Sequence, residues 1–231
     1  MSGNNRLNVV LGADPLFQPA TGIGNYTRYL ASNLLALQLV EALTLYANGV
    51  AVPGERLASI IDPQPESAPG QGSHRTSAST AGLLSTLRGY LASRGWALRA
   101  YQTLMPVLDR VRLHAHRDAV FHSPNYLLPA FAGPTVVTIH DLSIQRYPQY
   151  HPVERVRFLD ARIKDAAANA THIITDSSCV RAEILGHFGL DETRVTAIPL
   201  AAGEQFRPRS EADCRAVLEA LKIRYKRFFF F

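Results

Sequence analysis

A histidine–aspartate pair stands directly after an apolar run in the middle of the chain. Residues 135–139 read Thr-Val-Val-Thr-Ile, and His140 and Asp141 follow them. Ligands of open α/β sheets gather beyond the carboxyl ends of strands, so this pair is expected at a ligand-binding edge. His140 can donate a hydrogen bond to a sugar hydroxyl or a phosphate oxygen, while Asp141 can orient it or bind a hydroxyl. The alternative is a histidine satisfied by local backbone.

Two glycines lie where a first strand gives way to a first helix. The segment 21–28 carries Gly22, Gly24, Asn25 and Tyr26. Glycine lets the backbone approach a ligand closely, and a helix start offers unpaired N–H groups to an anion. The segment lacks the third glycine of the dinucleotide-binding fingerprint. A flexible turn without a ligand is the alternative interpretation.

Polar residues end two further predicted strands. Ser123, Asn125 and Tyr126 follow the run 119–122 and are candidates for a wall that contacts a sugar. Ser177 follows the run 172–175 and is a candidate ligand-binding residue, although a serine at this point more often caps the next helix.

Other chemistries lack their sequence signals. The chain has no Gly-x-Ser-x-Gly nucleophile elbow and no Gly-Lys-Ser/Thr phosphate loop. His114 and His116 form a close pair without a spaced third ligand, so no metal site is expected. Two distant cysteines, Cys179 and Cys214, predict neither a disulfide framework nor a zinc site.

The composition indicates a globular chain with a modest basic excess. Hydrophobic residues make up 47% and charged residues 19%, with a formal net charge of +5. The excess suits a phosphate-bearing ligand or an anionic membrane surface, but no basic stripe with interleaved aromatics predicts nucleic-acid binding. The amino terminus has no signal-peptide core, and no apolar run is long enough to span a bilayer. We expect a cytoplasmic location, with peripheral contact at the inner face of the cell membrane as a further option.

Strand and helix signals alternate along the chain. Short apolar runs ended by turn residues predict strands at 7–12, 43–47, 119–122, 135–139, 172–175 and 195–198. Helical spacing predicts helices beginning near Ile23, near Pro152 and after Ser177 or Ser178, with Gly189 ending the last, and two or three helices within 83–116. This alternation predicts an α/β fold, namely a doubly wound, mostly parallel Rossmann-like sheet with helices on both faces.

The domain prediction follows from composition shifts. We expect a Rossmann-like domain over 1–208, with a flexible insertion at 62–80 that is rich in Pro, Ser, Gly and Gln. Residues 209–231 are predicted as a linker helix, opened by a capping box at Ser210–Asp213, and the start of a strand from Ile223.

The order of the motifs resembles the amino-terminal domain of glycosyltransferase family 4. Gly-x-Gly-Asn-Tyr at 22–26 comes first, and Val-x-Thr-Ile-His-Asp-Leu follows at 136–142. Ala-x-x-Ile-Ile-Thr-Asp-Ser at 170–177 and Phe-Gly-Leu-Asp-x-x-Arg-Val-x-x-Ile-Pro-Leu-Ala at 188–201 complete the series. The resemblance runs from about Leu7 to Pro208 without the region 51–82, and it is similar to bacterial mannosyl- and rhamnosyltransferases of surface polysaccharide synthesis.

This resemblance implies a GT-B fold, in which two Rossmann-like domains face each other. The amino-terminal domain would bind mainly the acceptor, and the carboxy-terminal domain the nucleotide sugar, such as GDP-mannose, in a retaining reaction without a metal. The Gly22–Gly24 loop would approach the donor diphosphate, and His140 would contact the transferred sugar. The basic pair and Glu-x7-Glu motif of the carboxy-terminal domain are missing after Pro208. We therefore expect a truncated chain that is inactive alone and needs a partner chain to supply the donor domain.

Two other functions stay open from the sequence. One is a non-catalytic glycan- or protein-binding α/β module, or an inactive remnant, which would bind saccharide without transfer. The other is an unrelated Rossmann-type enzyme that uses a nicotinamide cofactor, against which the missing third glycine argues.

Overall fold

The computed structural model describes residues 6–17, 21–37, 40–52, 107–203 and 206–228. The insertion predicted at 62–80 and the helices predicted within 83–106 lie outside these ranges. The chain forms two compact units, Met1–Ile198 and Pro199–Phe231, whereas the sequence placed the boundary at 208. Each unit is described separately.

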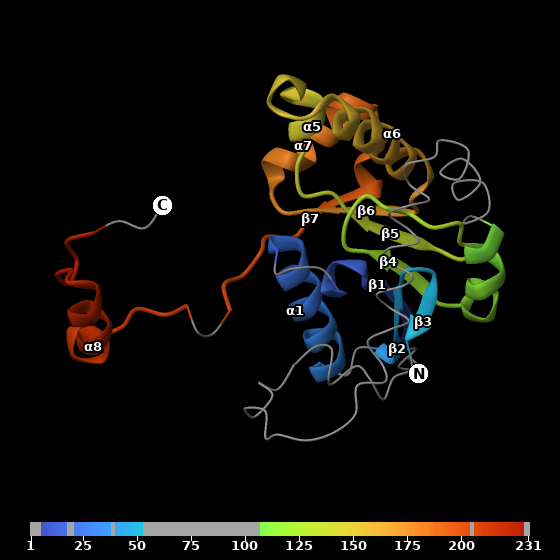
Figure 1. Cartoon of the computed structure of the whole chain (residues 1–231). Helices are drawn as coiled ribbons and strands as arrows, with labels where there is room; N and C mark the ends of the chain where they lie inside the picture. The colour runs from blue at the N-terminus through green and yellow to red at the C-terminus, as the bar shows by residue number, and fades with distance from the viewer. Residues whose placement is uncertain (1–5, 18–20, 38–39, 53–106, 204–205, 229–231) are drawn as a thin grey trace, which may run out of the picture. The chain divides into compact units, whose positions relative to one another are not determined.

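In the described part of the first unit, seven strands form one sheet in the order β3-β2-β1-β4-β5-β6-β7 (Figure 1). The strands are β1 (Leu7–Gly12), β2 (Val40–Ala47), β3 (Val50–Val52), β4 (Val120–Ser123), β5 (Thr135–Thr138), β6 (His172–Thr175) and β7 (Val195–Ala197). All neighbours are parallel except β2 and β3, so the carboxyl ends of six strands meet at one edge. The chain order reverses between β1 and β4, which confirms the doubly wound prediction.

Strand β3 is the one described strand that the sequence analysis missed. It returns antiparallel to β2 through Asn48 and Gly49, whose φ angles are 51° and 76°. Two positive φ values in a two-residue loop are the mark of a tight hairpin turn that favours Asn-Gly. The dipeptide was therefore a usable signal for this strand.

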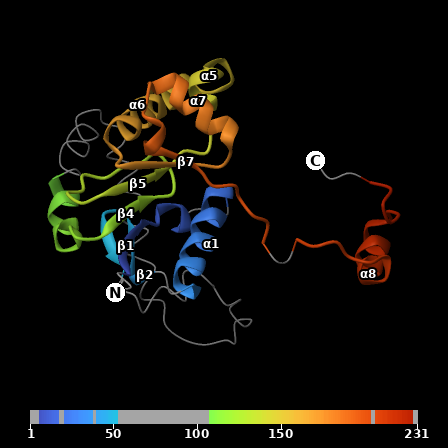
Figure 2. The same cartoon turned by 180° about the vertical axis from the view of Figure 1, so that it is seen from behind.

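Neighbouring residues of each strand point to opposite faces, and helices cover both. Val9 and Leu11 of β1 pack with Ala31 of α1 (Gly22–Ala36), whereas Val10 packs with Leu113 in the helical segment 107–113. On the face of Val10, α6 (Val153–Asn169) and α7 (Ser178–Phe188) pack on β5, β6 and β7. Figures 1 and 2 show α1 on one side of the sheet and α6 and α7 on the other.

Helix α1 contacts the sheet through small side chains. Its buried residues are Gly24, Thr27 and Ala31, with Leu30 and Leu34 packed beside them. Leu37, which follows the end of the helix, is exposed. Small residues at the contact let the helix backbone lie close to β1 and β2.

Local capping explains where the other helices begin and end. Ser177 Oγ accepts a hydrogen bond from Val180 N at the start of α7, and Gly189 ends that helix with a φ of 62°. Pro152 directly precedes α6, as the predicted helix start requires. The short elements of this unit are η1 (Asp14–Phe17), η3 (His114–His116), α5 (Ser143–Arg146), η4 (Pro148–Tyr150) and η5 (Glu192–Arg194).

Arg194 has a structural task within the motif at 188–201. Its guanidinium donates to the Ala170 carbonyl at 2.6 Å and to the Ala167 carbonyl at 3.1 Å. These carbonyls belong to the carboxyl end of α6, where backbone acceptors lack helical partners. Arg194, directly before β7, therefore connects the end of α6 to this strand.

The second unit contains α8 (Glu211–Leu221), which begins with the predicted capping box. Ser210 Oγ accepts from Asp213 N, and Asp213 Oδ2 accepts from Ser210 N. The strand predicted from Ile223 is wrong for residues 223–228, which form no strand and include a turn at 225–226. Lys222 and Lys226 have φ values of 54° and 56°, and a strand also needs a neighbouring strand for its hydrogen bonds. Residues 229–231 lie outside the described ranges.

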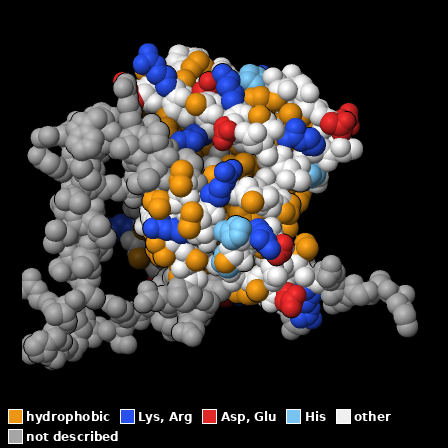
Figure 3. All heavy atoms as spheres, turned by 90° about the vertical axis from the view of Figure 1, so that its right-hand side faces the viewer, with side chains coloured by type: hydrophobic (Ala, Val, Ile, Leu, Met, Phe, Trp, Pro, Cys, Tyr) orange, Lys and Arg blue, Asp and Glu red, His pale blue; other side chains and the backbone are white. Residues whose placement is uncertain are grey.

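The basic residues on one face of the molecule are scattered. On the face drawn in Figure 3, Lys and Arg side chains are dispersed among hydrophobic and uncharged ones and form no continuous stripe. Among the described helices, none has the length and apolar character needed to cross a membrane.

Two glycines provide a matched stability test. A Cβ at Gly133 would lie 2.4 Å from the Arg117 carbonyl oxygen, whereas a Cβ at Gly186 in α7 would meet nothing within 4 Å. We predict that Gly133→Ala lowers the free energy of unfolding by about 2 kcal/mol or more through backbone displacement. Gly186→Ala should raise it by up to about 1 kcal/mol through helix propensity. Urea unfolding of both variants measures the difference, and equal midpoints would contradict the described packing before β5.

Candidate functional site

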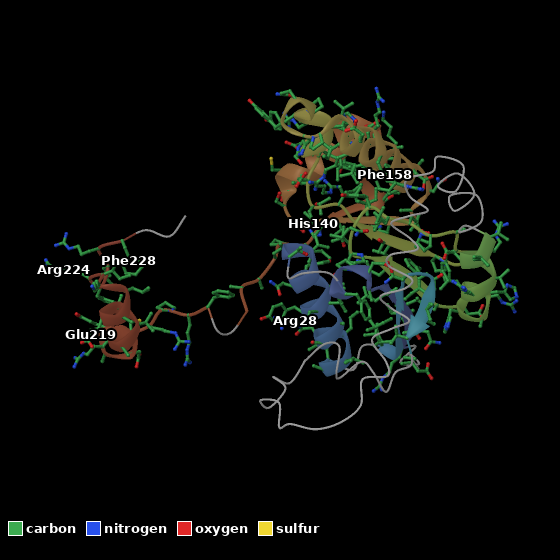
Figure 4. The ribbon with its side chains drawn as sticks, in the orientation of Figure 1. Arg28, His140, Phe158, Glu219, Arg224 and Phe228 are labelled. Atoms are coloured by element: carbon green, nitrogen blue, oxygen red, sulfur yellow. The ribbon has the colours of Figure 1, made fainter. Side chains whose placement is uncertain are left out.

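His140 lies between segments that follow three parallel strands and the start of α1. Its Nδ1 is 2.8 Å from Asp176 Oδ2, beyond β6, and its Nε2 is 3.1 Å from the Pro124 carbonyl oxygen, beyond β4. The Tyr26 ring of α1 meets the imidazole edge-on, with the ring centroids 5.1 Å apart. Figure 4 shows His140 beside the end of α1. The structure thus brings together residues 26, 124, 140 and 176.

The partner that orients His140 is Asp176, not Asp141. Asp141 is exposed, and its Oδ1 accepts a hydrogen bond from Ser143 N at 2.8 Å, which begins α5. The expectation that Asp141 orients the imidazole is therefore corrected. The physical reason is that successive residues diverge after a strand, while Asp176 reaches the same edge from the neighbouring strand. A catalytic role for Asp141 stays a prediction.

A hydrogen-bonded chain lies beneath His140. His122 Nε2 is 2.9 Å from Thr138 Oγ1, and Thr138 Oγ1 is 3.1 Å from the Tyr26 hydroxyl. His122 and Thr138 are buried, and burial lowers the pKa of His122 to about 4. Burial also raises the pKa of Tyr26. His122 is therefore neutral near neutral pH, and its tautomer matches the direction of the hydroxyl bonds.

The glycine loop forms the amino terminus of α1. Thr21 Oγ1 accepts from Gly24 N at 3.0 Å, so Thr21 is the helix cap. A Cβ at Gly24 would lie 3.0 Å from the Pro15 carbonyl oxygen, whereas Gly22 faces open space. The close approach of η1 therefore favours glycine at position 24, whereas a ligand contact of Gly22 stays a prediction. Asn25 is exposed at the same helix end.

The other candidate residues hold the loops in which they lie. Ser123 is buried, and its hydroxyl contacts the Asn125 and Leu127 carbonyl oxygens at 2.6 and 2.8 Å. Asn125 Oδ1 accepts from Leu127 N at 2.9 Å. Burial raises the pKa of Tyr126, which is half-buried. Ser177 caps α7, so the capping alternative holds for it. Direct ligand contacts of these residues stay predictions.

A crevice adjoins the His140 cluster at the point where the strand order reverses. It has a volume of about 260 Å³. Its walls come from the ends of β1, β2 and β4, the loop 124–130, the helical segment 107–113 and α6. The lining includes Asp14, Tyr46, Asp109, Phe121, Leu128 and Arg162. Pro124 lines the crevice and bonds to His140, so the two features are neighbours.

A Tyr–Asp pair connects one wall of the crevice to another. The Tyr46 hydroxyl donates to Asp109 Oδ1 at 2.5 Å. Burial, and then Asp109 itself, raises the pKa of Tyr46 above its usual range, so the phenol stays protonated as the donor. Asp14 Oδ1 accepts from Asn48 N at 2.7 Å.

Sequence reasoning missed Asp176, Asp14, Tyr46, Asp109 and Arg162 as site residues. The first three stand at or just beyond the ends of β6, β1 and β2, so the strand-end rule that selected His140 also applied to them. Asp109 and Arg162 come from crossover helices, and no local signal distinguishes them from other surface charges.

Comparison with known proteins assigns the family. Residues 20–202 match the family model described as Glycosyltransferase Family 4. The match covers most of the chain, which therefore belongs to this family, and the resemblance seen in the motifs is confirmed. Membership also argues against the nicotinamide-dependent alternative.

A curated relative carries a more specific name. The chain is 29% identical over 220 residues to the O-antigen chain mannosyltransferase B of Escherichia coli. The alignment covers 95% of this chain and 54% of the relative, so the chain spans about half of that protein's length.

The buried His122 predicts a pH-dependent stability. An unfolded histidine titrates near pH 6.5, whereas burial lowers the pKa of His122 to about 4 in the folded chain. The folded state therefore binds fewer protons between these values, and its stability should fall as pH drops from about 6.5 to about 4, by roughly 3 kcal/mol at most. His122→Gln should show a smaller loss, measured by urea unfolding at about pH 7.5 and about pH 5.

His172→Gln is the matched control for this test. His172 Nε2 is 2.9 Å from Thr196 Oγ1, which gives an exposed His–Thr hydrogen bond of the same length. An identical pH dependence in the wild type and His122→Gln would contradict burial of a neutral imidazole.

Proposed function

We propose that this chain is the acceptor-side part of a retaining glycosyltransferase that moves mannose from a nucleotide sugar, such as GDP-mannose, to a saccharide or lipid-linked acceptor. The observation that carries the proposal is the position of His140 in a family 4 chain. It lies where Tyr26, Pro124 and Asp176 converge at the carboxyl edge of the sheet. The name of the E. coli relative supports mannose as the sugar.

Two helix amino termini flank His140 and suit an anionic donor. Tyr26 stands in the first turns of α1, and Asp176 directly precedes the cap of α7. The first N–H groups of a helix lack intrahelical partners, and the helix dipole favours negative charge there. Thr21 satisfies Gly24 N, which leaves Gly22 N and Ile23 N for the donor diphosphate.

His140 would position the transferred sugar. Both of its ring nitrogens face oxygen acceptors in the structure. We expect a sugar hydroxyl to replace the Pro124 carbonyl as the partner of Nε2, while Asp176 holds the ring through Nδ1. The exchange is local, because the imidazole keeps its orientation.

Asp176 has a second feature that suits a working site. Its Oδ1 is buried and has no hydrogen-bond partner among the described residues. A buried acceptor without a partner costs about 1–3 kcal/mol. A ligand, or a rearrangement on binding, could supply the missing hydrogen bond to Asp176 Oδ1 and so remove this cost.

The proposed reaction is a simple exchange at the anomeric carbon. The bond from this carbon to the diphosphate oxygen breaks, and a bond to the acceptor hydroxyl oxygen forms. The hydroxyl proton ends on the released nucleoside diphosphate. The residues of this chain hold the sugar and align the acceptor, which can account for a large part of the barrier reduction.

The donor domain is proposed to come from a partner chain or segment corresponding to the rest of the relative. A cytoplasmic location and peripheral contact with the inner membrane face stay predictions.

The test is a transfer assay with the second half supplied in trans. The chain is mixed with the part of the E. coli relative outside the alignment, and mannose transfer from GDP-mannose to an oligosaccharide acceptor is measured. We predict that His140→Ala lowers kcat by at least about 100-fold, because a preorganised donor is lost. Asp176→Asn should give a smaller loss, because the ring keeps part of its support.

His114→Ala serves as the control, since His114 is exposed in η3, which precedes the amino-terminal end of β4, whereas His140 follows the carboxyl end of β5. Normal turnover in folded His140→Ala would remove His140 from the site. Saccharide binding without transfer from any nucleotide sugar would instead favour the non-catalytic module.

A further inference from the structure

We infer that the crevice at the β1–β4 reversal binds one uncharged sugar unit of the acceptor through hydroxyl hydrogen bonds to Asp109, and that it discriminates against phosphate. The inference rests on the proposed function and narrows the acceptor chemistry. It assigns a binding role to Asp109 and Asp14 and a positioning role to Tyr46.

The position of the crevice makes it a binding site for a ligand next to the donor. Ligands of doubly wound sheets bind at the point where strand order reverses, and β1 and β4 are that point here. Pro124 lies between the crevice and His140. It lines the crevice, and its carbonyl oxygen is the partner of His140 Nε2. A hydroxyl of a sugar in the crevice is therefore close to the proposed transfer point.

The size of the crevice suits a small ligand. Its volume of about 260 Å³ lies below the range of about 300–1,000 Å³ for drug-sized ligands. A nucleotide sugar is larger than such ligands, whereas a single sugar ring is smaller. Phe121, Leu128 and Pro129 give the crevice an apolar wall for the C–H face of a ring.

The Tyr46–Asp109 pair makes a prepared hydrogen-bond acceptor. Tyr46 donates to Asp109 Oδ1 and so fixes the carboxylate at the wall. Among the described residues, Tyr46 is the hydrogen-bond partner of Oδ1, and Oδ2 is the oxygen proposed to accept from a sugar hydroxyl. Hydroxyls are donors that a fixed carboxylate oxygen binds well, and charge-assisted hydrogen bonds are the stronger ones.

The charge of the lining selects against phosphate. Two carboxylates, Asp14 and Asp109, line the crevice with one guanidinium, that of Arg162. The Arg162 guanidinium lies 5.5 Å from the centroid of the Phe158 ring, which belongs to the same helix, α6. Arg112, which is close to Tyr46, donates to the Gly49 carbonyl oxygen. A phosphate in the crevice would thus meet like charge, which disfavours the wrong ligand.

The test compares two probes on the full chain. Binding of methyl α-D-mannopyranoside and of D-mannose 6-phosphate is measured by ligand-observed NMR titration. We expect the neutral glycoside to bind at least about tenfold more tightly than the phosphate. Asp109→Asn should weaken binding of the glycoside by about fivefold or more, because an amide oxygen accepts a hydrogen bond less strongly than a carboxylate. It should also reduce the ratio of glycoside affinity to phosphate affinity, because the amide repels phosphate less.

Three variants separate binding from structural effects. Asp118→Asn is the control, since its side chain is 91% exposed in the same connection before β4. Asp14→Asn repeats the test if Asp109→Asn does not fold. Tyr46→Phe should weaken glycoside binding less than Asp109→Asn does. It should also reduce the ratio of glycoside affinity to phosphate affinity, whereas loss of a purely structural tyrosine would leave this ratio unchanged.

Several outcomes overturn the inference while leaving the proposed function intact. These are equal or tighter binding of the phosphate, no binding of the glycoside, and equal effects of Asp109→Asn and Asp118→Asn. In the reassembled enzyme, Asp109→Asn should raise the KM for the acceptor and leave the KM for GDP-mannose unchanged. If the wild-type pair transferred no mannose while the glycoside discrimination stayed intact, the proposed function alone would be contradicted.

Discussion

The buried hydrogen bonds from His122 through Thr138 to Tyr26 fix the geometry on which the carboxyl edge depends. They join β4, β5 and α1, which are far apart in the sequence. Losing one partner would leave a buried polar atom unsatisfied, at a cost of about 1–3 kcal/mol. The chain therefore holds α1 at one distance from β5, and this places the Tyr26 ring against His140.

The parallel topology determines which residues meet at the carboxyl edge of the sheet. Since the strands end at one edge, residues that directly follow β4, β5 and β6 meet without any long loop. The two helices that start there, α1 and α7, add the positive ends of their dipoles. The crevice uses the same edge on the other side of Pro124, with walls from β1 and β2. The His140 cluster, proposed to face the donor, and the crevice, proposed to hold an acceptor sugar, thus share the backbone at Pro124.

Much of this arrangement could be predicted from local sequence. Strand ends, helix caps and helix stops depend on neighbours within a few residues. The predicted carboxyl ends of the strands lie within one residue of the observed ones. The Ser210 cap and the Gly189 stop were predicted correctly, and Ser177 was one of two predicted caps. Contacts across crossovers could not be derived this way. Asp176 rather than Asp141 faces His140, and Asp109 reaches Tyr46 from 63 positions away. The strand predicted from Ile223 rested on β-propensity. This propensity produces a strand only where a neighbouring strand is available, and the sequence does not reveal that neighbour.

A double-mutant cycle on Tyr26→Phe and Thr138→Val tests the central claim most directly. Effects of Thr138→Val on His122 are common to both backgrounds and cancel in the coupling energy. The account predicts a coupling of about 0.5–3 kcal/mol in the free energy of unfolding, because the two hydroxyls bond to each other. Additivity within about 0.3 kcal/mol would show that the Tyr26 hydroxyl does not tie α1 to β5, and it would contradict the geometry proposed for His140.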